Sequence, residues 1–217
     1  MKKTTRAARF TKKIDSEVLE FSESLTVDIV LFEADLKVTM AHVQMLAKCK
    51  LITKKELETI VSGLKKIKEA VDKDKFPWSY ELEDVHMNIE SQLTKIVGDV
   101  GKKIHMGRSR NDLVTTDLRI YLRDFIDVFL IKLRDLQYAL SKMAIIYSDS
   151  LFPGYTHLQV AQPVTFGHHL LAWNEMMHRD EKRLLDVRKH LNTMPLGSAA
   201  LSGTSYKIDR KMVAKKL

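Results

Sequence analysis

The longest helical stretch of the chain reads NDLVTTDLRIYLRDFIDVFLIKLRDLQYALSKMAIIYS and covers residues 111–148. It contains no Gly or Pro, and as an α-helix it would be roughly 50 Å long at 1.5 Å per residue. Apolar residues surround it on nearly all sides, at Leu118, Ile120, Leu122, Phe125, Ile126, Val128, Phe129, Leu130, Ile131, Leu133, Leu136, Leu140, Met143, Ile145 and Ile146. A helix that is apolar on most sides must be buried on most sides. We therefore expect a helix bundle completed by other subunits, the alternative being a monomer with one very buried helix.

The regions on both sides of this stretch also predict helices. Spacings of three and four indicate helices over residues 16–48, 53–67, 83–97 and 165–191, the second opening with a capping box of Thr53 and Glu56. Asp209 is a candidate N-cap for a last short helix. With only 8 Gly and 4 Pro, the chain has few turn-forming residues. We predict an all-α fold with an N-terminal helical domain (residues 1–108) and the first helices of a bundle (residues 109–217).

Composition limits the possible partners and location. The net charge of +8 suits an anionic partner, either a polyanion or a small polycarboxylate, although Lys and Arg are spread along the whole chain. The basic N-terminus is not followed by an apolar segment, so we expect a solvated tail rather than a secretory signal. No apolar run is long enough to span a membrane. The single Cys49 excludes an intramolecular disulfide and fits a reducing cytosol.

Residues 105–112, HMGRSRND, form the first polar cluster. Arg108, Ser109, Arg110 and Asn111 place two guanidinium groups, a hydroxyl and an amide at the start of the long helix. Arginine binds carboxylates through two parallel hydrogen bonds, and a helix N-terminus attracts anions. The segment is a candidate anion receptor. From composition alone, an N-cap flanked by surface arginines is about equally favoured.

Two further clusters contain histidine. Thr156, His157 and Gln159 lie in residues 154–162, where the histidine can carry a proton near neutral pH; taken alone, a structured turn with a surface histidine is the preferred interpretation. His86 and Glu90 lie one helical turn apart, as an ion-paired surface or as residues lining a site. No histidine pair has ligand spacing with a supporting carboxylate, so we expect no metal site.

Together these segments resemble the argininosuccinate lyase family of the fumarase and aspartase superfamily. The most specific stretches are GRSRND at 107–112, GYTHLQ at 154–159 and AQPVTFGHH at 161–169. Residues 21–25, 84–90 and 195–204 also match, so the resemblance runs from about Arg9 to the C-terminus.

The resemblance implies a helical bundle of the fumarase and aspartase type. It implies a cytoplasmic enzyme of arginine biosynthesis and the urea cycle, which reversibly splits argininosuccinate into arginine and fumarate without metal or organic cofactor. The family forms homotetramers in which three subunits build each active site. Nucleic acid and membrane partners are not expected.

The resemblance also assigns roles to single residues. His157 matches the catalytic histidine, which transfers a proton. Ser24, Asn111, Thr156 and Gln159 are expected to bind substrate. Arg108, Ser109 and Arg110 line the same region, and His86 matches a histidine that lines the site.

The chain departs from the family pattern in composition and in length. Ala8, Met106 and Leu113 stand where the family usually has Gly, Thr and Gln, and each lost hydrogen bond to a charged ligand would cost roughly 1.5–3 kcal/mol. Family members continue for about as many residues again, with a serine-containing loop and substrate-binding lysines. We therefore expect an incomplete site that is inactive alone. The alternatives are a non-catalytic helical scaffold or binding relative, and a basic nucleic-acid-binding helical protein.

Overall fold

A computed structural model of the chain describes residues 14–217. The predicted basic tail and the departure at Ala8 lie outside this range. The described residues form two compact units: the first extends to Asp117 and includes Pro195–Leu217, and the second is Leu118–Met194. The predicted domain boundary between residues 108 and 109 stays a prediction. Among the described helices, none combines the length and apolarity that a membrane crossing requires.

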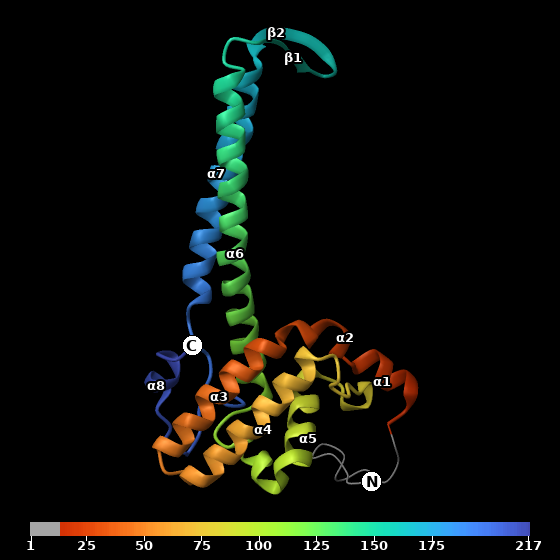
Figure 1. Cartoon of the computed structure of the whole chain (residues 1–217), viewed down its shortest axis with the longest axis vertical. Helices are drawn as coiled ribbons and strands as arrows, with labels where there is room; N and C mark the ends of the chain where they lie inside the picture. The colour runs from red at the N-terminus through yellow and green to blue at the C-terminus, as the bar shows by residue number, and fades with distance from the viewer. Residues whose placement is uncertain (1–13) are drawn as a thin grey trace. The chain divides into compact units, whose positions relative to one another are not determined.

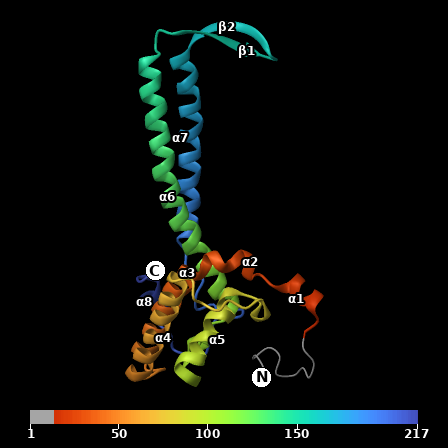
Figure 2. The same cartoon turned by 45° about the vertical axis from the view of Figure 1, so that its right-hand side comes forward.

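The first unit is a set of packed helices. Its elements are α1 (Ser16–Ser22), α2 (Leu25–Asp28), η2 (Ile29–Leu31), α3 (Phe32–Lys48), α4 (Lys54–Asp72), η3 (Tyr80–Leu82), α5 (Val85–Val97), η4 (Gly98–His105), the start of α6 (Arg110–Ile146) and α8 (Arg210–Ala214). Helices α3, α4 and α5 pack side by side, as Figures 1 and 2 show from two directions. Their facing side chains, including Val38, Leu46, Ile60, Leu64 and Leu93, are fully buried and form the core.

Local sequence signals in this unit have mixed outcomes. The capping box of Thr53 and Glu56 is confirmed at the start of α4, and Asp209 caps α8 as predicted. The single helix over residues 16–48 is wrong, because the chain breaks between α1 and α2. The backbone N–H groups of Ser24 and Leu25 donate to the Glu83 carbonyl, at 2.8 and 3.1 Å. This tertiary contact replaces the intrahelical bonds that local periodicity predicts.

The second unit is an antiparallel pair of long helices. It contains most of α6 together with α7 (Phe166–Leu191), which run side by side in Figure 1. Arg134 Nε lies 2.8 Å from Glu181 Oε1, and a Cβ atom at Gly167 would lie 2.5 Å from the Ala144 carbonyl oxygen, so the helices approach closely there. The prediction of an uninterrupted helix over about residues 111–148 is confirmed.

A β-hairpin joins the two long helices, which the sequence analysis did not predict. Strands β1 (Leu151–Thr156) and β2 (Gln159–Thr165) pair antiparallel, with Thr156 opposite Gln159. His157 and Leu158 therefore form a two-residue turn, with φ angles of 49° and 61°. Such turns favour Asn-Gly because both residues need positive φ, and that signal is absent here. The all-α class is nevertheless confirmed.

The outer surface of α6 in the second unit is strongly apolar. Its exposed large side chains include Phe125, Val128, Phe129, Ile131, Leu136, Met143, Ile145 and Ile146. Ile145 is 76% exposed, which is unfavourable for an isoleucine in water. The apolar residues thus surround this helix as the sequence indicates, and its partner α7 covers only part of them.

Candidate functional site

The receptor segment, residues 105–112, is fixed to α3 by a buried histidine. His42 Nε2 lies 2.8 Å from the Met106 carbonyl oxygen. Burial, reinforced by the charge of Arg108, lowers the pKa of His42 to about 3. The imidazole is therefore neutral at physiological pH and donates its Nε2–H to the carbonyl.

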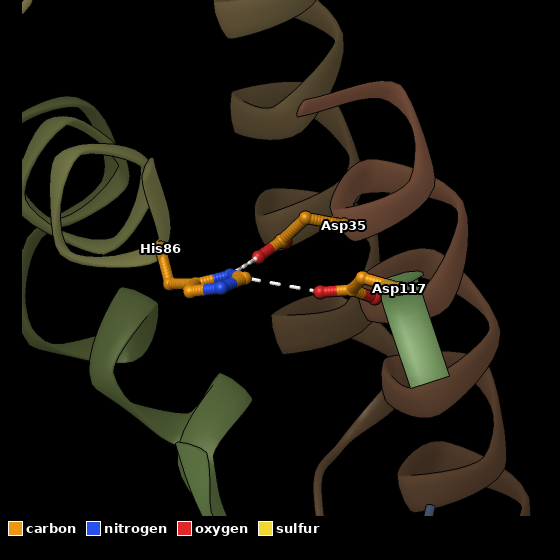
Figure 3. Close-up of side chains that lie close together, drawn as sticks. All are labelled: Asp35, His86 and Asp117. Carbon is orange, nitrogen blue, oxygen red and sulfur yellow. Dashed lines mark hydrogen bonds and ion pairs between the residues drawn. The ribbon is translucent and has the colours of Figure 1, made fainter. Parts of the chain in front are cut away.

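Arg108 of the receptor segment points into the protein rather than to solvent. Its Nη1 donates to Thr39 Oγ1 at 3.0 Å, and Thr39 donates to Asp35 Oδ1 at 2.9 Å. The other oxygen of Asp35 accepts from His86 Nδ1, as Figure 3 shows. Asp117 Oδ2 lies 3.6 Å from the same His86 nitrogen. Asp35, Thr39, His86, Arg108 and Asp117 form what we call the buried polar cluster.

The surroundings shift the pKa values of the two carboxyl groups of this cluster in opposite directions. Burial raises the pKa of Asp35, but the hydrogen bond from His86 and the charges of His86 and Arg108 outweigh it and bring the pKa below its usual value. Burial and the nearby charge of Asp35 raise the pKa of Asp117 well above its usual value. The hydrogen on His86 Nδ1 is donated to Asp35, and the Asp117 oxygens accept no hydrogen bond from the described residues, so burial of Asp117 favours its protonated form.

Asp35, His86 and Asp117 could in principle bind a metal ion, because their ligand atoms lie within 4.8 Å of one another. The sequence analysis missed this grouping because the three residues come from three different helices. The fit to a cation is poor. Arg108 already places a positive charge beside both carboxyl groups, and Asp35 already engages the Nδ1 atom of His86, the ring nitrogen nearest to Asp117. The positive charges of the surrounding arginines, Arg108 and Arg110, also disfavour a further cation beside Asp117.

Arg110 lies near two carboxylates, that of Asp84 at the N-cap of α5 and that of Glu90 on α5. Its Nε lies 3.4 Å from Asp84 Oδ2, and its Nη2 lies 3.9 Å from Glu90 Oε2. His105 Nδ1 approaches the same Glu90 oxygen at 3.4 Å, and burial beside Arg108 and Arg110 lowers the pKa of His105 to about 4. The proposed His86 and Glu90 surface pair does not form, because His86 turns to Asp35 and Glu90 turns to the receptor segment.

Ser24 lies near the start of α5. Its hydroxyl donates to Asp28 Oδ2 at 2.7 Å, and Asp28 Oδ1 accepts from the Val85 backbone N–H at 3.1 Å. Burial raises the pKa of Asp28. The first unit therefore contains Ser24, His86 and the whole receptor segment.

The receptor segment presents few free groups to solvent. Asn111 is exposed and Ser109 is half-buried, whereas Arg108 is buried. Leu113 is 1% exposed, so its side chain packs in the core rather than facing a ligand. Met106 contributes its carbonyl to the bond with His42.

Thr156, His157 and Gln159 lie in the second unit, at the exposed tip of the hairpin. An aromatic cluster supports the base of the hairpin, with Phe152 5.5 Å from Phe166 and 5.3 Å from His169 between ring centroids. Positive φ at His157 is a strained conformation for a residue with a Cβ, and such strain gathers at functional sites. The hairpin thus places an exposed imidazole on a supported base.

Asp28, Thr39 and Asp117 were not singled out from the sequence, and neither were Asp35 and His42. A signal for the last two was present, since both occupy places in the apolar spacing of α3. A polar residue at such a position is buried and needs a partner.

The fold is that of the helical fumarase and aspartase superfamily. A family model described as "Lyase" matches residues 8–217, and the chain belongs to this family. It is 52% identical over 209 residues to an argininosuccinate lyase of Alkalilimnicola ehrlichii and 52% identical over 209 residues to one of Pseudomonas syringae pv. tomato. Each comparison covers 96% of this chain and 45% of the relative, so the chain spans less than half of their length.

A solved structure shows the same likeness. The chain superposes on an EDDS lyase in complex with formate with a TM-score of 0.78 and 30% identity, covering 90% of this chain and 38% of the other. The family resemblance inferred from residues 107–112, 154–159 and 161–169 is confirmed by the family model and by the identity to the two argininosuccinate lyases.

Proposed function

We propose that this chain forms part of an argininosuccinate lyase active site. The reaction splits argininosuccinate reversibly into arginine and fumarate and belongs to arginine biosynthesis. The observation that carries the proposal is the receptor segment at the N-terminus of α6. His42 bonds to its backbone at Met106, and its own Arg108 side chain bonds to Thr39 of α3. The high identity to two argininosuccinate lyases supports it.

The elimination sets clear chemical demands. A base removes a proton from the carbon next to a carboxylate, the carbon–nitrogen bond breaks, and the leaving guanidinium nitrogen receives a proton. Negative charge develops on the carboxylate, so donors must already be aimed at it. Asn111, Ser109 and the first N–H groups of α6 supply such donors in the first unit, with Ser24 nearby. His157 transfers a proton, with Thr156 and Gln159 binding substrate beside it.

Some predicted binding residues act indirectly in this proposal. Arg108 and His86 are hydrogen-bonded inside the buried polar cluster, so they fix the receptor segment in place and do not contact the substrate. Arg110 is shared by Asp84 and Glu90, and a substrate carboxylate would compete with them for its guanidinium. No cofactor takes part in the proposed reaction.

We also propose that the protein assembles as a homotetramer. The exposed apolar face of α6 in the second unit supports this, because burial against other subunits would remove it from water. Residues beyond the part of the relatives that this chain spans are proposed to complete the site. We therefore expect little or no activity from the 217 residues alone.

Fumarate release from argininosuccinate, followed by ultraviolet absorbance, tests the function. One arm uses the chain alone and a second adds the remaining residues of the Alkalilimnicola ehrlichii relative as a separate polypeptide. Turnover in the second arm that disappears in His157→Ala, but persists in His190→Ala on the exposed end of α7, supports the proposal. Absence of turnover in both arms, with both polypeptides folded and associated, would overturn it.

A further inference from the structure

Asp112 is buried at the start of α6 and accepts three backbone hydrogen bonds. One carboxylate oxygen accepts from the Ser109 N–H at 2.8 Å. The other accepts from the N–H groups of Gly197 and Ala199, at 2.8 and 2.7 Å. Asp112 is only 3% exposed. A single carboxylate therefore joins the receptor segment to a loop more than eighty residues later, which we call the 195–203 loop.

The 195–203 loop has an unusual backbone that suits this carboxylate. Gly197 has a φ of 98° and Ala199 a φ of 52°, which turns both N–H groups to one side. A φ of 98° strains any residue with a Cβ atom, and a Cβ at Gly197 would also lie 2.8 Å from the Arg210 side chain, so the position favours glycine. Successive N–H groups arranged in this way form a concave anion-binding backbone. Here the protein's own carboxylate occupies it.

The same loop contacts a candidate substrate-binding side chain. Asn111 Nδ2 lies 3.4 Å from the Ala200 carbonyl oxygen, within hydrogen-bonding distance. Asn111 and Asp112 are neighbours in the chain. Because the Asp112 carboxylate holds the 195–203 loop, it also fixes the Ala200 carbonyl of that loop beside Asn111. The amide of Asn111 has one donor engaged by the loop, and its remaining donor and its oxygen are left for a ligand.

We propose that Asp112 is a positioning residue: it holds the 195–203 loop against the N-terminus of α6 and thereby orients Asn111 for the substrate carboxylate. The orientation of Asn111 follows from the contacts above, and its use for substrate rests on the proposed function. Asp112 does not touch the substrate in this proposal.

Asp112→Asn tests the anchoring in the 217-residue chain, because it keeps the size of the side chain and removes its charge. Amide exchange at Gly197 and Ala199, measured by NMR, is expected to accelerate about tenfold or more, since hydrogen bonds to a charged acceptor are among the stronger ones. The side-chain amide resonances of Asn111 are expected to shift. Asp186→Asn, which removes an exposed carboxylate on α7, is the matched control and should leave both unchanged.

Gly197→Ala displaces the loop without altering Asp112 and should shift the Asn111 resonances in the same direction. Unchanged amide exchange and unchanged Asn111 resonances in Asp112→Asn would overturn the anchoring.

Calorimetric titration with argininosuccinate then tests the link to the site. If Asp112 acts through Asn111, Asp112→Asn weakens binding in the wild-type background and has no further effect in Asn111→Ala. Equal weakening in both backgrounds would overturn the proposal. If the wild-type chain alone binds no argininosuccinate, the titrations are made with the remaining residues of the Alkalilimnicola ehrlichii relative added, and absence of binding there means that the proposed function fails. Amide exchange and the Asn111 resonances still decide whether Asp112 positions Asn111.

Discussion

The first unit encloses ionisable groups such as Asp35 and Asp117, whereas the second unit leaves large apolar side chains such as Phe125 and Ile145 in water. The two units therefore differ in what they bury and what they expose. The first unit buries acidic and basic side chains beside one another, and both side-chain oxygens of Asp117 have no hydrogen-bond partner among the described residues. The second has more apolar surface than two helices can cover. The receptor segment is thus organised by contacts within the chain, while the long helices would gain most from burial against other subunits.

Asp35→Ala should produce the largest effect on this comparison. It leaves Arg108 and His86 buried without their shared carboxylate, and breaking a buried pair in this way costs about 3–5 kcal/mol. The free energy of unfolding from urea titration measures the loss. Asp186→Asn on the surface should change it by less than about 0.5 kcal/mol. Equal stabilities for the two variants would mean that the buried polar cluster does not hold the first unit together.

Phe125→Gln combined with Phe129→Gln tests whether the exposed apolar face of α6 in the second unit is a subunit contact. Both rings are exposed on α6, so the folded monomer should keep its stability. Association should weaken by about 1.5–3 kcal/mol for each phenylalanine that a partner subunit buries. Sedimentation equilibrium measures the association. If the double variant associates as tightly as the wild type, this face of α6 lies outside the subunit contacts.

Acid titration separates two kinds of buried group in the first unit. His42 has its pKa lowered to about 3, so the unfolded chain binds more protons below pH 6.5 and stability falls as the pH drops toward 3. The slope from this group is about 1.4 kcal/mol per pH unit. His42→Gln should remove that part of the slope, as thermal or urea unfolding between pH 4 and 7 would show.

Asp117 should contribute to the pH dependence of the free energy of unfolding with a slope opposite in sign to that of His42. Its pKa is raised in the folded state, so its contribution is largest below the ordinary carboxyl pKa and is lost as the pH rises toward the folded value. Asp117→Asn should therefore stabilise the chain at neutral pH and steepen the loss of stability in acid. A lower stability at pH 7 in this variant would contradict a protonated Asp117.

Leu158→Asn should have the smallest effect. Leu158 is 94% exposed and has a φ of 61°, a conformation that asparagine adopts more easily than leucine. The hairpin should gain up to about 1 kcal/mol, read from slower amide exchange in β1 and β2. A loss of stability would mean that the leucine side chain itself supports the turn.

The sequence predicts helices well where the signal is local and fails where distant backbone contacts decide. The capping box of Thr53 and Glu56 and the Gly- and Pro-free stretch of α6 depend on neighbouring residues alone. The break at Ser24 depends on the Glu83 carbonyl, which no periodicity reveals. The hairpin around His157 was missed because its turn residues are unsuited to positive φ.

In the candidate site too, the local sequence signals could be predicted and the contacts between distant residues could not. The receptor segment was visible as a run of adjacent polar residues. The acidic residues of the buried polar cluster, Asp35 on α3 and Asp117 further along α6, are single acidic residues in otherwise helical sequence. Their role follows only from packing, which brings them to His86.

The bond from His42 to the receptor segment ends on a backbone carbonyl, at Met106. Every amino acid offers the same carbonyl, so this attachment is indifferent to the side chain at position 106. Methionine there, in place of the threonine that the resembling family usually carries, leaves the anchor intact. Position 106 is thus a place where an engineer can vary size and polarity next to the receptor segment without loosening its hold on α3.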